Sequence, residues 1–145
     1  MCVFNVETGE LLSKYCHKNK NQDLFSVAWT KTENCGDLLA TGSSSGEIRL
    51  YHVERNVSIH HWTETKNLSV NAVQFHPDFP NYLFAACKEG AVKLWDIGDP
   101  APPYYEKVQN DLLITLKIPG TFDSLIVTFS IYCNLFQTHC FFSRG

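Results

Sequence analysis

Two segments of the chain share one pattern of small, apolar and polar positions. Residues 46–53 read GEIRLYHV, and residues 90–97 read GAVKLWDI. Each segment starts with a glycine, which permits a tight turn, and continues as an alternating strand. The two glycines are 44 positions apart, and at the same offset LLATGS (38–43) aligns with YLFAAC (82–87). The chain therefore contains an internal repeat.

Each copy of the repeat predicts four short strands bounded by polar or glycine-containing turns. The first copy predicts strands at 24–30, 37–42, 47–53 and 57–62, and the second at 70–75, 82–87, 91–97 and, more weakly, 104–108. Residues 2–6 and 11–15 predict an N-terminal hairpin, with Gly9 at a positive φ in its turn. Weak alternation at 112–118 predicts the start of a further copy. All of these elements are strands, so the expected fold class is all-β.

A repeat of this length that ends in Trp95-Asp96 resembles the WD-repeat family, whose four-stranded blades stack radially into a β-propeller. The resemblance implies a partial propeller within residues 1–120, with blades at about 24–62 and 70–108 and a half blade at 2–15. In that family, a turn aspartate, a histidine, a strand hydroxyl and the tryptophan form a hydrogen-bond network. The first copy lacks the aspartate and the tryptophan, so we expect it to rely on packing alone. The structural signature residues are Gly46, Tyr51, Gly90, Trp95 and Asp96.

Two stretches are similar to a narrower group within that family. FSVAWT (25–30), and LFAA (83–86) leading to LWDIGDP (94–100), resemble the WD domains of leucine-rich repeat and WD repeat-containing proteins that associate with the origin recognition complex. The resemblance implies a nuclear chromatin protein that binds origin recognition complex subunits and modified histone tails. Because a propeller needs about four to eight blades, we expect a fragment or truncated isoform that lacks the other blades of its propeller. The candidate partner-binding residues are Thr65, Lys66, Lys88 and Glu89.

Apolar strand positions predict a core between the two blades, and the outermost blade faces are predicted to lack a neighbour and to promote association. Residues 121–145 do not continue the repeat and predict a hydrophobic tail that adds to this tendency. The predicted core residues are Val27, Trp29, Leu39, Leu50, Val73, Phe75, Leu83 and Leu94.

Charge and cysteine content limit the kinds of partner and compartment that the sequence favours. With 12 basic and 15 acidic side chains, the net charge of −3 does not favour direct binding to nucleic acid. The six cysteines lack CxxC spacing, which favours buried, reduced thiols in an intracellular protein. The N-terminus has no basic leader followed by a long apolar core, and the apolar run within 125–136 is too short to span a membrane.

The sequence shows no group of residues with the spacing of a catalytic, metal-binding or phosphate-binding site. The adjacent His60 and His61 should point to opposite faces of a strand, and Cys133, His139 and Cys140 form only a loose cluster. Ser43 to Ser45 lack the lysine and the helix of a phosphate-binding loop. We therefore predict a non-catalytic scaffold for protein–protein interaction that has no cofactor or metal, with a reader of modified histone tails and an enzyme on a WD-like scaffold as alternatives. Trp29, Tyr51, Phe75 and Trp95 could cage a methylated lysine, but their places inside strands favour core packing.

Overall fold

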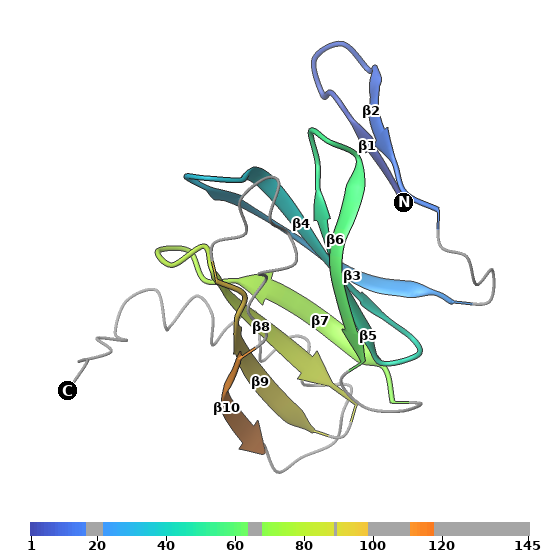
Figure 1. Cartoon of the computed structure of the whole chain (residues 1–145). Coiled ribbons are helices and arrows are strands. Elements are labelled where there is room, and N and C mark those ends of the chain that lie inside the picture. The colour runs from blue at the N-terminus through green and yellow to red at the C-terminus, as the bar shows by residue number, and fades with distance from the viewer. Residues whose placement is uncertain (17–21, 64–67, 89, 99–110, 118–145) are drawn as a thin grey trace.

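The computed structural model describes residues 1–16, 22–63, 68–88, 90–98 and 111–117 (Figure 1). Within these ranges, the regular secondary structure consists of ten β-strands, which confirms the all-β prediction. The strands are β1 (Cys2–Phe4), β2 (Leu11–Lys14), β3 (Leu24–Thr32), β4 (Gly36–Ser43), β5 (Glu47–His52), β6 (Val57–Thr63), β7 (Val70–Phe75), β8 (Tyr82–Cys87), β9 (Ala91–Asp96) and β10 (Asp111–Lys117).

The strands form three antiparallel sheets. One has the order β3-β4-β5-β6 and is called blade one, and another has the order β10-β9-β8-β7 and is called blade two. The third is the two-stranded β1–β2 sheet, called the half blade. The half blade lies beside blade one, and blade one stacks on blade two (Figure 1). This arrangement is that of a partial β-propeller, as the sequence predicted.

The turns confirm that the two blades are copies of one unit. Gly46 and Gly90 have φ angles of 83° and 80°. Their N–H groups donate to the carbonyl oxygens of Ser43 and Cys87 at 3.3 and 3.0 Å. Gly9 in the half blade has a φ of 71°, as predicted. Because this region of backbone space disfavours side chains, the repeated glycines set the same turn in both blades.

The fourth strand of blade two differs from the prediction. β10 pairs antiparallel with β9, with Leu112 opposite Trp95 and Leu116 opposite Val92. Residues 112–118 were predicted to start a further copy of the repeat, and that prediction is wrong because this segment completes blade two. The strand predicted at 104–108 and the tail predicted at 121–145 lie outside the described residues.

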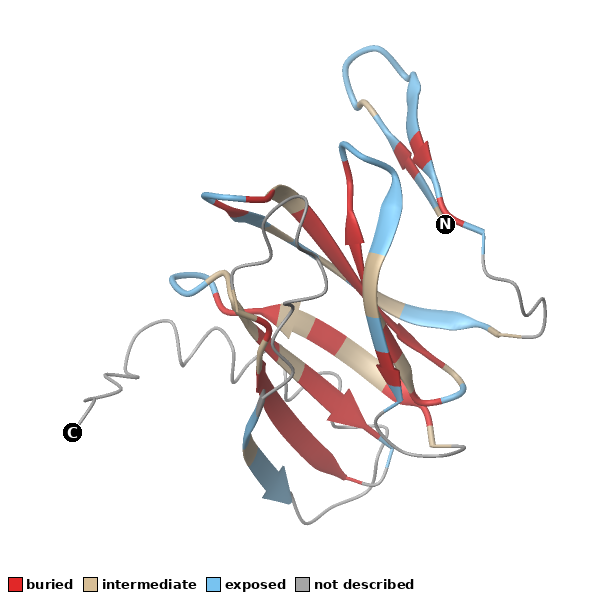
Figure 2. Cartoon of the chain, viewed as in Figure 1, coloured by how far each residue is buried: buried red, intermediate tan, exposed pale blue. Residues whose placement is uncertain are grey.

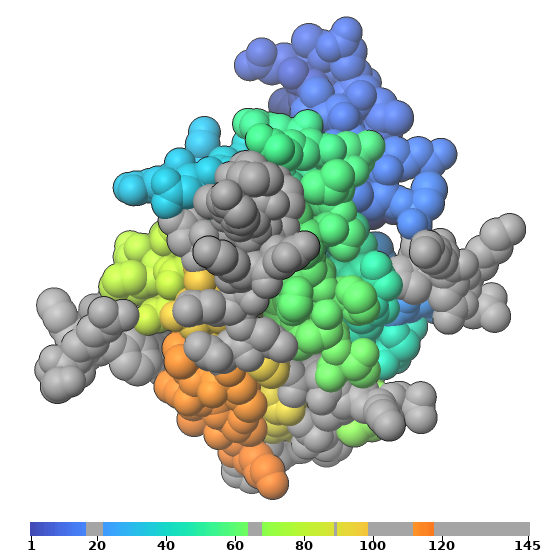
Figure 3. Space-filling model, viewed as in Figure 1, coloured from blue at the N-terminus to red at the C-terminus, as the bar shows by residue number. Residues whose placement is uncertain are grey.

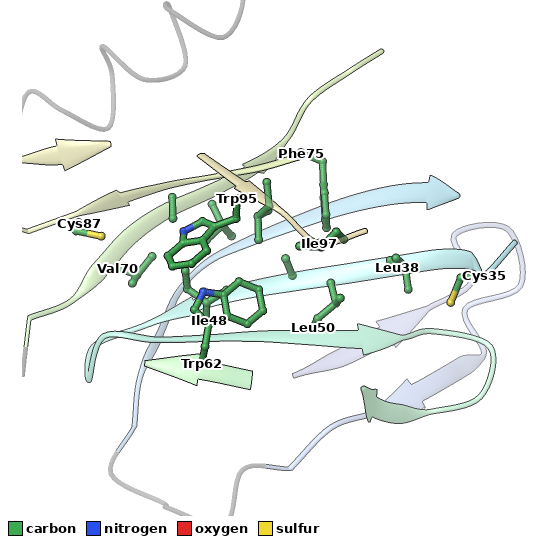
Figure 4. Packing of buried hydrophobic residues seen from close by; sticks show 14 residues of the cluster. Cys35, Leu38, Ile48, Leu50, Trp62, Val70, Phe75, Cys87, Trp95 and Ile97 are labelled. Carbon is green, nitrogen blue, oxygen red and sulfur yellow. The ribbon is translucent and has the colours of Figure 1, made fainter. Parts of the chain in front are cut away.

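The main core lies between the two blades. Figure 4 shows Leu38, Ile48 and Leu50 of blade one packed towards Val70 and Phe75 of blade two, in a cluster that also includes Val73 and Leu83. The sequence had placed Leu50, Val73, Phe75 and Leu83 in this core, and the structure confirms these four. Gly42 permits the close approach, since a Cβ atom there would lie 2.8 Å from Cγ1 and 2.9 Å from the carbonyl oxygen of Val70.

The other four predicted core residues lie elsewhere. Leu39 is buried against the half blade, in a separate cluster with Val3 and Tyr15. Leu94 pairs with Phe84 and is buried on the far face of blade two. Side chains alternate between the faces of a strand, so the repeat pattern identified apolar positions correctly but did not say which neighbour each face would meet. Val27 and Trp29 are exposed, and they belong to the surface described below.

The cysteine prediction holds only in part. Cys35 and Cys87 are buried free thiols, whereas Cys2 and Cys16 are free and exposed. The expectation of buried thiols is therefore wrong for Cys2 and Cys16, which lie in and just after the half blade, where one sheet face has no cover. No part of the chain that the structure describes forms a helix long and apolar enough to cross a membrane.

Candidate partner-binding surface

The half blade covers the outer part of blade one. The rings of Tyr15 and Tyr51 lie 4.4 Å apart. The Tyr15 hydroxyl donates to the carbonyl oxygen of His52 at 3.0 Å, and the Ser13 hydroxyl donates to that of Val53 at 2.8 Å. Burial raises the pKa of both tyrosines, so the phenols remain protonated donors. These contacts fix the half blade over the end of β5, and Figure 3 shows it beside β5 and β6 at one end of the molecule.

The inner part of the same face is uncovered. Phe25, Val27 and Trp29 alternate along β3 and are 53%, 59% and 48% exposed, and in Figure 2 much of β3 is pale blue. Trp29 pairs with Leu39 and Val27 with Thr41, so these two side chains share the face on which the half blade sits, and Phe25 lies in the irregularity between Leu24 and Ser26. The Trp29 indole N–H donates to Asp37 Oδ1 at 3.2 Å, which orients the ring. We call Phe25, Val27 and Trp29 the open face.

A groove of about 500 Å³ borders the open face and runs between the inner strands of the two blades. It is lined by residues 25–29 of β3 and 71–75 of β7. The Val73 N–H donates to the Ser26 hydroxyl oxygen at 3.1 Å and joins the two strands. Ser26, Asn71 and Gln74 are the polar residues of the lining. A groove lined by both apolar and polar side chains can hold an extended protein segment.

The signature residues of blade two have structural contacts. Trp95 is buried with its ring 5.8 Å from that of Trp62. Asp96 Oδ1 accepts hydrogen bonds from Asn81 Nδ2 at 3.1 Å and from the Gly98 N–H at 2.8 Å. This is the geometry of a structural acceptor, because both donors belong to the neighbouring loops. Tyr51, the counterpart of Trp95, makes the equivalent contact to Tyr15 of the half blade.

Trp95 lacks the hydrogen bond that the family network implies. Its indole nitrogen is buried without a partner among the described residues. Ala85 occupies the strand position at which blade one has Thr41, since each pairs with the equivalent residue of the first strand, Val73 and Val27. Blade two therefore lacks the strand hydroxyl that blade one has at this position.

Blade one has a polar network that the sequence did not predict. Gln22 Nε2 donates to Ser43 Oγ and to Glu47 Oε2, each at 2.8 Å. Ser43 Oγ also accepts the Glu47 N–H at 3.1 Å, and Arg49 forms an ion pair with Glu47 at 2.6 Å. The expectation that blade one relies on packing alone is wrong, because Gln22 before β3 and Ser43 at the end of β4 form hydrogen bonds with each other and with Glu47. The serines at 43–45 were the available signal.

Of the four predicted partner-binding residues, Lys88 lies within the described residues. Lys88 is exposed in the β8–β9 turn, and its N–H donates to the Ser69 carbonyl oxygen at 2.9 Å. This bond holds the turn against the start of β7. Thr65, Lys66 and Glu89 lie outside the described residues.

The adjacent His60 and His61 lie in different surroundings. His60 is half-buried with its ring 5.3 Å from Trp62, whereas the neighbouring His61 is exposed, in keeping with opposite faces of β6. Burial lowers the pKa of His60, which favours its neutral form. Within the described ranges, no three His, Cys, Asp or Glu side chains are placed to hold a metal ion. The cluster of Cys133, His139 and Cys140 lies outside those ranges.

Comparisons with known proteins agree with this architecture. Residues 1–132 match the family described as the WD domain of leucine-rich repeat and WD repeat-containing protein 1. Relatives of that name share 29% identity over 130 residues in Danio rerio, 32% over 125 in Mus musculus and 31% over 128 in Homo sapiens. These matches cover 83%, 81% and 82% of this chain. The chain spans only 16%, 18% and 19% of the length of those relatives.

Proposed function

Because the chain belongs to the family of the WD domain of leucine-rich repeat and WD repeat-containing protein 1, we propose that it is a non-catalytic platform for protein–protein interaction. The observation that carries the proposal is the open face. The large apolar side chains of Phe25, Val27 and Trp29 lie exposed on β3, beside the part of blade one that packs against the half blade. Contiguous exposed apolar surface of this kind marks an interaction site.

The surroundings of the open face also favour a protein partner. The polar residues that line the groove beside it are Ser26 and the uncharged amides Asn71 and Gln74. A backbone segment could satisfy these amides while its apolar side chains covered Val27 and Trp29. A small charged metabolite would find no complementary charge among those lining residues.

The narrower proposal concerns the partner and the compartment. The resemblance to proteins that associate with the origin recognition complex supports a nuclear, chromatin-bound role, with origin recognition complex subunits as binding partners. The exposed Lys88 is the described residue that we assign to this contact, and Thr65, Lys66 and Glu89 remain proposed with it. The other blades of a complete propeller would be further partners of this chain.

A reader of modified histone tails is the alternative within the same class. Such a reader needs two or more aromatic rings within about 6 Å of one ammonium group. Phe25 and Trp29 are the exposed aromatic residues of the open face, but four residues along a strand separate them by about 13 Å. Phe75 and Trp95 are buried in the core. The aromatic residues of the open face therefore favour a protein platform over a methyl-lysine cage at that face.

Binding assays with the 145-residue chain test the proposal. We would immobilise the wild-type chain, Lys88→Glu and, as a matched control on an exposed residue elsewhere, Val6→Asp, and add purified origin recognition complex subunits. The proposal expects retention by the wild type and Val6→Asp and reduced retention by Lys88→Glu. Retention no greater than that of empty resin would contradict the proposed partner.

Two further measurements separate the alternatives. Titration with methylated and unmethylated histone peptides should give equal affinities, and a clear preference for the methylated peptide would favour the reader. A screen of the same preparation for hydrolase and transferase turnover should give no rate above buffer. A rate that follows the folded chain through purification would favour the enzyme.

A further inference from the structure

His52 occupies the position in blade one that Asp96 occupies in blade two. The two residues fall at the same place in the aligned segments GEIRLYHV and GAVKLWDI. Asp96 Oδ1 accepts the N–H of Gly98, two residues further along the chain. His52 is 1% exposed, and its Nδ1 accepts the N–H of Arg55 at 3.3 Å. Each side chain therefore holds the backbone that follows the third strand of its blade.

The turn that His52 holds is also the turn that bonds to the half blade. The Tyr15 hydroxyl donates to the carbonyl oxygen of His52 at 3.0 Å, and the Ser13 hydroxyl donates to that of Val53 at 2.8 Å. The Val53 carbonyl oxygen also accepts the Asn56 N–H at 3.1 Å, and Asn56 has a φ of 54°. Such a conformation is uncommon for a residue other than glycine and depends on the contacts that hold it. The positions of the two carbonyl groups therefore depend on the conformation of this turn.

The neutral form of His52 is the form that can hold the turn. A neutral imidazole has one nitrogen that accepts a hydrogen bond, whereas both nitrogens of an imidazolium are donors. A protonated His52 would therefore direct an N–H group at the N–H of Arg55. Burial lowers the pKa of His52 below the ordinary 6.5. The imidazole is therefore neutral above pH 6.5 and becomes charged as the pH falls below that value.

The charged groups around His52 would draw the imidazolium away from this position. Glu54 and Arg55 belong to its own turn, and Asp37 belongs to β4. Glu54 and Asp37 raise the pKa of His52 and so attract its charged form, whereas Arg55 lowers the pKa and repels that form. From the half blade, the Tyr15 hydroxyl approaches the carbonyl oxygen of His52. A shift of the ring towards the carboxylates would therefore also disturb the contact with the half blade.

We propose that His52 is a pH-sensitive switch in the contact between blade one and the half blade. The neutral side chain holds the turn, and the turn presents its carbonyl groups to Ser13 and Tyr15. Protonation at mildly acidic pH breaks the bond between His52 Nδ1 and the Arg55 N–H and weakens the contact between the blades. Aspartate side chains ordinarily titrate at about pH 4, so a switch in this pH range requires the histidine. The inference goes beyond the proposed function, because it concerns the stacking of the blades and not the partner that they bind.

Amide hydrogen exchange measured by mass spectrometry on the 145-residue chain tests the switch. The protection of residues 1–16, corrected for the effect of pH on intrinsic exchange, is compared at about pH 7.5 and about pH 5.5. Protection in the wild type should fall by at least about threefold more than in His52→Asn, whose Oδ1 accepts a hydrogen bond at both pH values. His61→Asn replaces an exposed histidine of β6 and is the matched control, which should behave like the wild type.

The remainder of the chain separates a local effect from general unfolding. The protection of β8 and β9 should change by the same factor in the wild type and in His52→Asn, because the switch acts only on the half blade. An equal loss of protection in residues 1–16 of the two proteins would overturn the inference. A half blade without protection at about pH 7.5 would overturn it too, since there would be no contact to weaken.

Two exposed residues of the turn give a test that leaves His52 in place. Glu54→Gln removes an attractive charge and should move the midpoint of the protection loss to lower pH, whereas Arg55→Gln removes a repulsive charge and should move it to higher pH. Each change should be about 0.2 to 0.5 in pH, the size expected of exposed charge pairs. These surface variants keep the test valid if His52→Asn unfolds. A midpoint that both variants leave unchanged, or that both move in the same direction, would overturn the inference.

Discussion

Trp62 in β6 and Trp95 in β9 lie with their ring centroids 5.8 Å apart and their planes inclined by 57° (Figure 4). Each indole comes from a different blade, so this contact joins the outer part of blade one to the third strand of blade two. Tyr15 and Tyr51 make the same kind of contact between the half blade and blade one, at 4.4 Å and 47°. An aromatic pair between neighbouring blades is therefore a repeated feature of the stack.

The two tryptophans should be energetically coupled. Trp62→Leu and Trp95→Leu should each lower the free energy of unfolding by about 2 to 4 kcal/mol, because both side chains are buried. The double variant should lose about 0.5 to 1.5 kcal/mol less than the two losses combined, which is the usual size of an aromatic pair contribution. Urea unfolding measures all four proteins. Strict additivity would show that the contact contributes nothing beyond burial.

Gly42→Ala should destabilise the stack of blades. Alanine in a strand interior is normally more stable than glycine by about 0.5 to 1 kcal/mol. Here the added methyl group would meet Val70 Cγ1 at 2.8 Å and the Val70 carbonyl oxygen at 2.9 Å, so we expect a loss of about 1 to 3 kcal/mol instead.

A second variant tests the cause of that loss. Val70→Ala removes the side-chain half of the clash but not the carbonyl half, so Gly42→Ala should cost less in the Val70→Ala background than in the wild type. Thermal unfolding gives the comparison. A Gly42→Ala chain as stable as the wild type would show that the blades lie farther apart.

Ala85→Thr should provide Trp95 with a hydrogen-bond partner. Residue 85 lies on the same sheet face as Leu83, which is opposite Trp95, so a hydroxyl there is diagonal to the unpaired indole nitrogen. Ala85→Val has nearly the same shape without the hydroxyl and is the matched control. Ala85→Thr should be more stable than Ala85→Val by about 1 kcal/mol. The difference should vanish in a Trp95→Phe background, and its persistence there would assign the gain to another group.

His76 should make the stability depend on pH. Burial lowers its pKa below the ordinary 6.5, against a smaller raising effect of Asp78, and its Nδ1 accepts the N–H groups of Asp78 and Phe79 at 3.1 and 3.2 Å. The unfolded chain binds this proton near pH 6.5 and the folded chain only at lower pH. Stability is therefore complete above pH 6.5 and is lost as the pH falls below it.

A conservative variant isolates the contribution of His76. His76→Asn keeps an oxygen acceptor for both N–H groups but has no titratable ring. Urea unfolding at a series of pH values should show a shallower loss of stability below pH 6.5 in His76→Asn than in the wild type. An identical pH profile would assign the loss to other groups, of which His52 is one, because burial also lowers its pKa.

The sequence was informative where one local rule decides the outcome. Glycine positions 44 residues apart predicted equivalent turns, and Gly46 and Gly90 have nearly equal φ angles. Alternation predicted all four strands of blade one and the first three strands of blade two, and it covered most of the residues in each. The strand at 112–118 was predicted but assigned to a further copy of the repeat, because the proline-rich sequence after Gly98 gives no indication of where the chain returns to the sheet.

Contacts between sheets were harder to predict. Alternation shows that Trp29 and Ala28 occupy opposite faces of β3, but not which face meets blade two; Ala28 packs against the core and Trp29 does not. The network around Gln22 was missed because its partners come from a distant turn. Both wrong predictions concern residues that are in contact in the fold but far apart in the sequence. The periodicity of a strand does not show which distant residues its side chains will contact.

The rates at which hydroxyl radicals oxidise the three tryptophans report on the stacking of the blades. Because the inner face of the stack at β3 is open, Trp29 should be oxidised much faster than Trp62 and Trp95, which are buried between the blades. The rates are measured by mass spectrometry on the 145-residue chain, diluted until sedimentation shows a monomer. Fast oxidation of Trp29 with protection of Trp62 and Trp95 is the expected result, and equal rates for all three would contradict the account.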